Sequence, residues 1–268
     1  MKGSVGQYSS KNLFNFLAGL PTLSRPNILR WFRNNLEIET KEDLSPVTAV
    51  DFNVEAILRS EIKKQFPADN ITGEEFKGDT QTSSPYCWVI DPIDGTKAFV
   101  SGKPVFGTLV GLVFNGDPIA GLVDFPALDE TYIGLNGFSG VQKAMLGRVP
   151  VAPSKCLRLK NARLATTSPR VLSSECLQGF NRLADRVAIT NYGGDCHNYA
   201  LIASGHLDIV MEDRLAPHDI AAVAGLMLAA GVTVTDLEGV PIVIGYSTGI
   251  LAAATPSLHA DALKLISN

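Results

Sequence analysis

The apolar run YCWVI at residues 86–90 is followed at once by two aspartates, Asp91 and Asp94. Such a run predicts a buried strand that delivers Asp91 at its carboxyl end, and we expect Pro92 to stop the strand there. Carboxylates this close in the chain repel each other when both are ionised. We therefore expect a cation between them, at the end of a strand where α/β folds commonly bind ligands.

The residues after Asp94 predict a turn and the start of a helix. Gly95 and Thr96 lead into the segment TKAF, and Thr96 is expected at the helix cap. The free N–H groups of a helix N-terminus suit a phosphate, and carboxylate oxygens favour Mg²⁺ over Zn²⁺. The alternative is that Asp94 is an ordinary turn residue and Asp91 a helix cap, with no metal between them.

Two further stretches carry acidic residues that could complete a metal site. The segment GEE at residues 73–75 places Glu74 and Glu75 just before the predicted strand, and Asp219 stands at the head of an alanine-rich apolar helix. Each has an ordinary alternative, because Glu-Glu pairs are common in solvated turns and aspartate is a common N-cap residue.

The chain divides into two halves with different patterns, residues 1–150 and 151–268. In the first half, two short amphipathic helices, the second with Pro26 near its start, and a third with Asp51 near its start precede strand-like runs such as GTLVGLVF. This order predicts an α+β half with helices packed on a largely antiparallel sheet. In the second half, strands at ARLATTS, RVAIT and LDIVME alternate with helices, which indicates a more parallel α/β arrangement.

Composition excludes several classes of protein. A formal charge of −4, with 46% hydrophobic and 19% charged residues, is typical of a globular protein and offers no basic surface for nucleic acid. No uninterrupted apolar stretch reaches the roughly 18 residues of a membrane span, and the N-terminus lacks the apolar core of a signal peptide, so we expect a cytoplasmic protein. The four cysteines form no CxxC pair, which favours reduced thiols over zinc ligands or disulfides.

Three motifs together resemble those of the inositol monophosphatase family of Mg²⁺-dependent phosphatases: GEE, WVIDPIDGTKAF at residues 88–99 and HDIAAVAGLMLAAG at residues 218–231. The resemblance runs from about residue 45 to residue 239. It implies a layered αβαβα sandwich, a homodimer, a small phosphorylated substrate and two or three Mg²⁺ ions per site. His218 departs from the pattern of many members, which have tryptophan or tyrosine there, and we expect it to support Asp219.

The resemblance also implies which residues hold the metal. Glu74 and Asp91, with the backbone carbonyl of Ile93, would bind one Mg²⁺ ion. Asp91 would bridge to a second ion that is also held by Asp94 and Asp219. All of these ligands are oxygens, in agreement with the preference of Mg²⁺ argued above from the residue types.

The remaining catalytic roles follow from the same resemblance. The N–H groups of Gly95 and Thr96 would bind the phosphate oxygens. Thr96, hydrogen-bonded to Asp51, and Glu74 would orient and deprotonate the attacking water. No covalent phosphoenzyme is expected in this scheme.

Within the family, three segments are most similar to the histidinol-phosphate phosphatase branch: TTSPR at residues 166–170, FVSGKPVFGTLVGLV at 99–113 and YGGDCHNYALIASGHLDIVMEDRLAPHD at 192–219. Asp195, His197 and Glu212 are then candidates to bind histidinol phosphate, because nearby carboxylates suit its ammonium and imidazole groups. The alternative substrate is another phosphomonoester, such as inositol 1-phosphate, or a bisphosphate. For Glu212 and His197 the ordinary alternatives are an exposed residue after a strand and a structural histidine.

Two other classes of protein fit less well. Aspartyl-phosphate phosphatases carry D-x-D-G-T, and here Pro92 stands where their nucleophilic aspartate would be. A non-enzymatic relative that keeps only a binding or scaffold role is disfavoured, because the four side-chain metal ligands and Thr96 are all present.

Overall fold

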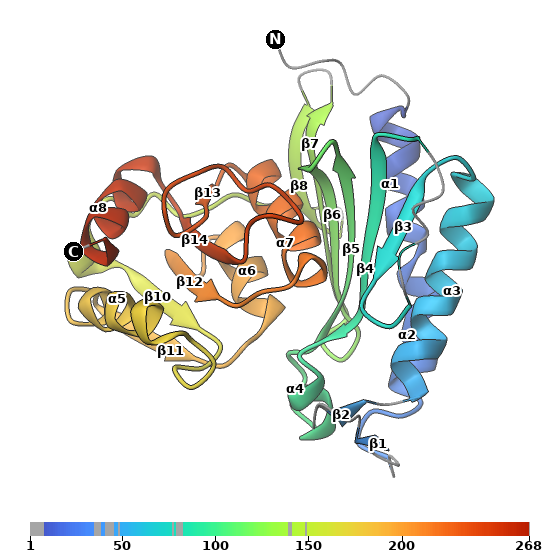
Figure 1. Cartoon of the computed structure of the whole chain (residues 1–268), viewed down its shortest axis with the longest axis horizontal. Helices are drawn as coiled ribbons and strands as arrows, with labels where there is room; N and C mark the ends of the chain where they lie inside the picture. The colour runs from blue at the N-terminus through green and yellow to red at the C-terminus, as the bar shows by residue number, and fades with distance from the viewer. Residues whose placement is uncertain are drawn as a thin grey trace.

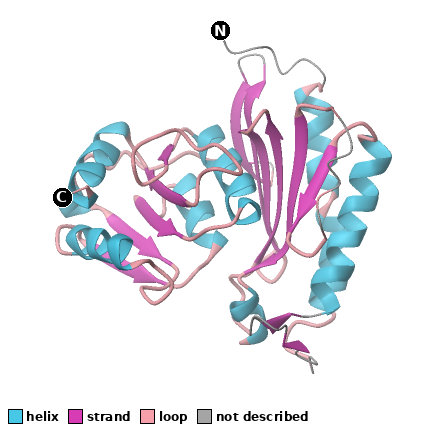
Figure 2. Ribbon diagram, in the orientation of Figure 1, coloured by secondary structure: helices cyan, strands magenta, loops and turns pink. Residues whose placement is uncertain are grey.

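The computed structural model describes residues 8–34, 39–40, 46–47, 49–76, 78, 83–138, 141–147 and 149–267. These residues form alternating layers of helix, sheet, helix, sheet and helix, from right to left in Figures 1 and 2. The αβαβα sandwich that the motifs imply is confirmed.

Within the described residues, seven strands form one sheet, the large sheet, in the order β3-β4-β5-β6-β7-β8-β9. Its strands are β3 (Asn70–Gly73), β4 (Tyr86–Asp94), β5 (Gly107–Phe114), β6 (Asp117–Phe125), β7 (Glu130–Phe138), β8 (Val141–Leu146) and β9 (Val149–Pro150). Neighbours from β4 to β9 run antiparallel, whereas β3 runs parallel to β4. The largely antiparallel sheet expected for the first half is therefore confirmed. A short antiparallel pair, β1 (Glu39–Thr40) and β2 (Pro46–Val47), lies apart from this sheet.

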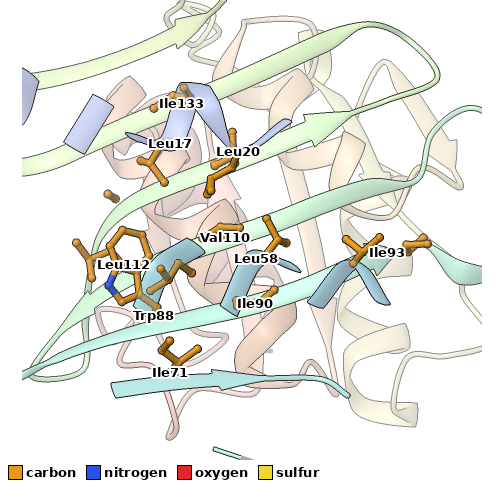
Figure 3. Packing of buried hydrophobic residues seen from close by; sticks show 14 of the residues in the cluster. Leu17, Leu20, Leu58, Ile71, Trp88, Ile90, Ile93, Val110, Leu112 and Ile133 are labelled. Atoms are coloured by element: carbon orange, nitrogen blue, oxygen red, sulfur yellow. The ribbon is translucent and has the colours of Figure 1, made fainter. Parts of the chain in front are cut away.

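Helices cover the outer face of the large sheet (Figure 1). They are α1 (Ser10–Gly19), α2 (Pro21–Leu29) and α3 (Ala49–Gln65). Their apolar sides form one buried cluster with the sheet, in which Leu17 and Leu58 gather with Trp88 (Figure 3). Asp51 lies in the first turn of α3, as expected, but Pro26 lies inside α2 because that helix already begins at Pro21.

The inner face of the large sheet contacts α7 (Pro217–Ala230), which lies with α6 (Cys196–Ala203) between the two sheets (Figure 1). Helix α7 is apolar and buried along most of its length. A Cβ atom on Gly121 of β6 would lie 1.9 Å from the carbonyl oxygen of Ala222, so only glycine allows this approach. Gly111 and Gly134 are similarly crowded, with hypothetical Cβ atoms 2.7 and 2.5 Å from atoms of α7. Backbone contact with strand glycines thus sets the position of α7.

The other described sheet, the small sheet, has five strands in the order β11-β10-β12-β14-β13. These are β10 (Arg163–Thr166), β11 (Ile189–Tyr192), β12 (Ile209–Asp213), β13 (Thr233–Thr235) and β14 (Gly249–Ala253). Strand β10 runs parallel to β11 and β12, whereas β14 runs antiparallel to β12 and β13, so the expected parallel character holds for part of this sheet. Its outer face is covered by α5 (Ser174–Ala184) and α8 (Pro256–Ile266), and the 3₁₀ turn η1 (Leu159–Asn161) precedes β10.

Strand β4 does not stop at Pro92. It continues to Asp94, with a shift of register against β5 between Asp91 and Asp94. Such an irregularity accommodates a residue that lacks an N–H group, and the carbonyl of Pro92 accepts a hydrogen bond from the hydroxyl of Thr108 at 2.8 Å. The prediction that Pro92 ends the strand is therefore wrong.

No helix within the described residues is long and apolar enough to cross a membrane. All four cysteines are free, and Cys176 and Cys196 are buried. The chain leaves the large sheet after β9 and enters the small sheet at Arg163, with α7 packed between them. The division of the chain into halves at residue 150 stays a prediction.

The close packing of α7 generates a stability prediction. We expect Gly121→Ala to lower the free energy of unfolding by about 3 kcal/mol, because the new methyl group meets backbone atoms that cannot rotate away. Gly19→Ala is the matched control, since a Cβ atom at Gly19 meets nothing within 4 Å. Urea unfolding of both variants measures the difference, and equal stabilities would show that α7 can shift without cost.

Candidate active site

Asp91 lies at the centre of a group of acidic side chains. It lies near the carboxyl end of β4 and is only 2% exposed. Among the described residues, its Oδ1 atom has no hydrogen-bond partner. A buried, unpartnered carboxylate oxygen is costly, so this atom suits a ligand that the protein chain itself does not supply.

Asp94 and Asp219 approach Asp91 from two different elements. The ligand oxygens of these three residues all lie within 4.8 Å of one another. The carboxylate of Asp94, at the end of β4, accepts a hydrogen bond from the N–H of Cys196 at 2.7 Å. The carboxylate of Asp219 accepts one from the N–H of Ala216 at 2.7 Å, which fixes it in the first turn of α7.

Burial and neighbouring negative charges raise the pKa values of two of these carboxyl groups, Asp91 and Asp94. Burial raises the pKa of Asp91 well above its ordinary value, and the charges of Asp94, Glu74 and Asp219 raise it further. Burial also raises the pKa of Asp94, together with the charges of Asp219 and Asp195, although the hydrogen bond from Cys196 opposes the rise. A cation bound at the cluster would oppose these rises in pKa, because it favours the ionised carboxylates.

Glu74 joins the cluster from the other side of Asp91. Its backbone N–H donates to the carbonyl of Ile90 at 3.1 Å, so the residue directly extends the pairing of β3 with β4. Ligand atoms of Glu74, Asp91 and His218 lie within 4.8 Å of one another. His218, expected only to support Asp219, thus also faces Glu74, and its ring nitrogen lies 3.8 Å from Asp219.

Asp51 also lies close to this cluster. It is 2% exposed, and its charge contributes to the raised pKa of Asp91. The hydrogen bond expected between Thr96 and Asp51 is not formed, because the Thr96 hydroxyl donates to the carbonyl oxygen of Ile93 at 3.2 Å. The structure thus brings Asp51 to the cluster but gives Thr96 a different partner.

The turn after Asp94 differs in one detail from the prediction. The helix α4 (Thr96–Val100) has Gly95 as its N-cap residue, in the left-handed conformation with φ of 78°, and Thr96 is its first residue. A non-glycine residue is strained in that conformation. A Cβ atom at Gly95 would also lie 3.1 Å from the Asp195 carboxylate. Gly95 therefore allows both the turn and the approach of Asp195.

A cavity of about 390 Å³ lies against the acidic cluster. Its lining includes Asp94 and Asp219 together with Asp195, Tyr199 and Glu212. Burial raises the pKa of Asp195, although the nearby ammonium groups of Lys97 and Lys103 oppose the rise. Two of the carboxylates predicted to bind metal, Asp94 and Asp219, thus share one cavity with the two carboxylates predicted to bind substrate.

Glu212 is a buried residue within β12, not an exposed one after a strand. It is 5% exposed, and its two carboxylate oxygens accept hydrogen bonds from the N–H of Thr167 and the hydroxyl of Tyr199. Burial raises its pKa in spite of these hydrogen bonds. The carboxylate is therefore held in one orientation.

His197 does not line the cavity that Glu212 lines. It faces a neighbouring cavity of about 650 Å³, and its ring packs edge-on against Phe125 with ring centroids 4.9 Å apart. Burial lowers its pKa. Residues two apart in a helix point in different directions. Tyr199 of α6 therefore lines the acidic cavity, whereas His197 lines the neighbouring one.

The donor set fits a hard divalent cation. The two groups of possible ligands share Asp91, and carboxylate oxygens make up all of one group and most of the other. Oxygen-rich sets of this kind suit Mg²⁺. The carbonyl of Ile93, also expected as a ligand, accepts the Thr96 hydroxyl and keeps a second lone pair.

Sequence reasoning missed the residues that hold these side chains in place. Glu55 accepts hydrogen bonds from the N–H groups of Glu75 and Phe76, and Cys196 and Tyr199 donate to Asp94 and Glu212. One available signal was the spacing of Glu55, one helical turn after Asp51. No local pattern marks the backbone N–H of Cys196 as a partner of Asp94, 102 positions away in the chain.

Comparison with known proteins agrees with this geometry. The model of the inositol monophosphatase family matches residues 20–268. A chloroplastic bifunctional phosphatase of Arabidopsis thaliana is 38% identical over 97% of this chain and 78% of its own length. A histidinol-phosphatase of Mycobacterium tuberculosis is 36% identical over 85% of this chain and 87% of its own.

The fold comparison gives the same result. The structure of an inositol monophosphatase from Zymomonas mobilis superposes with a TM-score of 0.87 and 30% identity, and covers 98% of this chain and 100% of its own. The motif-bearing residues, the layered fold and these matches lead to one conclusion. This chain is a member of the inositol monophosphatase family.

Proposed function

We propose that this family member is a Mg²⁺-dependent phosphomonoesterase that hydrolyses L-histidinol phosphate to histidinol and phosphate, as in histidine biosynthesis. The observation that carries the proposal is the cavity that Asp94 and Asp219 of the acidic cluster line together with Asp195 and the buried Glu212. Its chemistry suits a phosphate ester with a cationic leaving group, because metal ions at the cluster would bind the phosphate and the other carboxylates would pair with the cation.

The proposed metal site, which adjoins the cavity, involves four carboxylates and one carbonyl. Glu74, Asp91 and the Ile93 carbonyl would hold one ion, and Asp91, Asp94 and Asp219 another. When bound, such ions supply positive charge to the phosphoryl oxygens and lower the pKa of water. The unpartnered Oδ1 atom of Asp91 supports its role as the residue shared by both ions.

Residues around the cluster would position the phosphate and the water. The N–H groups of Gly95 and Thr96 lie at the start of α4 and would bind phosphate oxygens. Glu74 would accept a proton from the attacking water, and the Thr96 hydroxyl, with Asp51 nearby, would orient that water. Water attacks the phosphorus in line with the departing ester oxygen, so no covalent enzyme intermediate is required.

The leaving-group end of the cavity would provide specificity. The ammonium of histidinol phosphate would pair with Glu212, whose orientation is set by Thr167 and Tyr199, and with Asp195. Inositol carries only neutral hydroxyls, so it gains less from a buried carboxylate. His197 lines the neighbouring cavity, which shares Asp195 with this one, and its part in substrate binding stays a prediction.

The second candidate substrate is inositol 1-phosphate, because one of the matched structures is an inositol monophosphatase. A phosphate-release panel with histidinol phosphate, inositol 1-phosphate, fructose 1,6-bisphosphate and adenosine 3′,5′-bisphosphate separates the candidates. A preference for inositol 1-phosphate would reject the histidinol proposal and leave the phosphatase assignment. The homodimer and the cytoplasmic location stay predictions.

We expect Glu212→Gln to reduce kcat/KM for histidinol phosphate at least tenfold, because loss of a buried charge partner costs about 2–5 kcal/mol. Hydrolysis of glycerol 2-phosphate, a monoester whose leaving alcohol is neutral, should change much less. Tyr199→Phe is the matched control, since it removes one hydrogen bond to Glu212 but keeps the carboxylate. Equal losses on both substrates would mean that Glu212 supports the site without recognising the substrate.

Thr96→Ala should lower kcat far more than it raises KM. The hydroxyl is proposed to orient water, whereas phosphate binding uses the backbone N–H that alanine retains. Thr96→Ser keeps the hydroxyl and should restore most of the turnover in a steady-state assay. A change confined to KM would indicate a binding role instead.

Asp91→Asn should leave less than about a tenth of wild-type turnover, a loss above ~1.4 kcal/mol of transition-state stabilisation.

The same variant should be more stable than the wild type without metal at pH 7, with a Tm higher by about 3 °C or more. A carboxyl with a raised folded pKa stabilises the fold fully below its unfolded pKa of about 3.9, and this stability is lost as the pH rises toward the folded pKa.

Two scans test this stability prediction. Metal-free thermal melts from pH 4 to pH 8 should show the gap between Asp91→Asn and the wild type widening with pH. Melts with added Mg²⁺ should raise the Tm of the wild type but not that of the variant. A variant that is less stable at every pH, or that Mg²⁺ still stabilises, would contradict the central position given to Asp91.

A further inference from the structure

We propose that Glu55 and Arg59 of α3 form a clamp that sets the position of Glu74 and thereby the affinity of the site for a divalent cation. The inference rests on the proposed function, because it takes Glu74 to be a metal ligand. Neither clamp residue has a polar atom among the possible metal ligands. They are therefore positioning residues and not catalytic ones.

Glu55 is fully buried beneath the segment that carries Glu74. One of its carboxylate oxygens accepts the N–H of Glu75 at 2.7 Å, and the other accepts the N–H of Phe76 at 3.3 Å. These two donors follow Glu74 directly in the chain. The carboxylate thus holds the backbone on the C-terminal side of Glu74.

Arg59 completes the clamp from one turn further along α3. Its Nε donates to Glu55 at 2.7 Å, and its Nη2 donates to the carbonyl of Phe76 at 3.0 Å. Its guanidinium also lies over the ring of Phe76, 5.6 Å from the ring centroid. The pair therefore binds both the N–H and the C=O of Phe76 and neutralises its own buried charge.

Gly73 allows Glu55 to come this close. A Cβ atom at Gly73 would lie 2.2 Å from the Glu55 carboxylate, so any other residue would displace it. On the N-terminal side, the N–H of Glu74 donates to Ile90 of β4 at 3.1 Å. Glu74 is thus held between the strand that carries Asp91 and the clamp.

Helix α3 therefore serves the site at two successive turns. Asp51 and Glu55 are four positions apart, which places them on the same side of the helix. Asp51 lies near Asp91, and Glu55 lies under the segment of Glu74. Glu74 is exposed, and its backbone anchors and His218, which faces it, contribute to where its carboxylate points.

The test compares Glu55→Gln with Glu61→Gln. Glu61 is a half-buried glutamate of the same helix that pairs with Lys64. A glutamine side chain has one acceptor oxygen and turns an N–H donor toward one of the loop N–H groups. We expect the Mg²⁺ dissociation constant of Glu55→Gln, measured by calorimetry, to rise at least about tenfold, as for other residues that orient metal ligands. Glu61→Gln should bind Mg²⁺ like the wild type.

Amide hydrogen exchange in the metal-free chain provides a readout that does not depend on activity. The N–H groups of Glu75 and Phe76 should exchange faster in Glu55→Gln, with little change in the strands of the small sheet. Gly73→Ala should show the same two effects, because its methyl group displaces the Glu55 carboxylate. In the double variant the losses of Mg²⁺ affinity should not add, since both substitutions break one contact.

The outcomes separate this inference from the proposed function. The clamp proposal is overturned if Glu55→Gln and Gly73→Ala bind Mg²⁺ as tightly as the wild type and Glu61→Gln do. The metal site stands in that case. If the wild type binds no Mg²⁺, both proposals fail. Should Glu55→Gln not fold, Gly73→Ala carries the same test from the other side of the contact.

Discussion

The burial of α7 between the two sheets is the contact on which the rest of the structure depends. Its alanine-rich sequence lets backbone meet backbone, and Gly121 of β6 leaves space that no side chain could share. Because the helix is pressed against the large sheet, its first turn is fixed relative to the end of β4. Asp219 consequently meets Asp91 and Asp94 although it comes from the other half of the chain.

The resulting cluster destabilises the folded state, and the same carboxylates form the candidate metal site. Several carboxylates are brought together, and burial with mutual repulsion raises the pKa of Asp91 and Asp94. Packing of the two sheets on α7 offsets this cost, which a bound cation would then relieve. The hydrogen bonds from Cys196 to Asp94 and from Ala216 to Asp219 hold the carboxylates in place without supplying positive charge.

The cavity proposed to discriminate between substrates is lined by elements from both sides of the fold. Strand β12 and α6 belong to the small-sheet side, and they bring Glu212 and Tyr199 to the cavity that β4 and α7 close from the other side. Asp94 and Asp219 at this cavity belong to motifs that resemble those of the family, whereas Asp195 and Glu212 lie outside these motifs.

The sequence by itself determined the strand that bears Asp91 and the helix that begins near Asp219, because apolar periodicity and local turn residues act over short distances. Its resemblance to the family motifs predicted the layered fold. It also placed Glu74, Asp51 and Thr96 near the cluster through motif resemblance. Only the tertiary structure decided that β4 passes through Pro92, that Thr96 donates to Ile93 and that His197 lines the cavity next to the one that Glu212 lines. Local patterns do not encode these outcomes, because each depends on contacts between segments that are brought together only when the two sheets pack on α7.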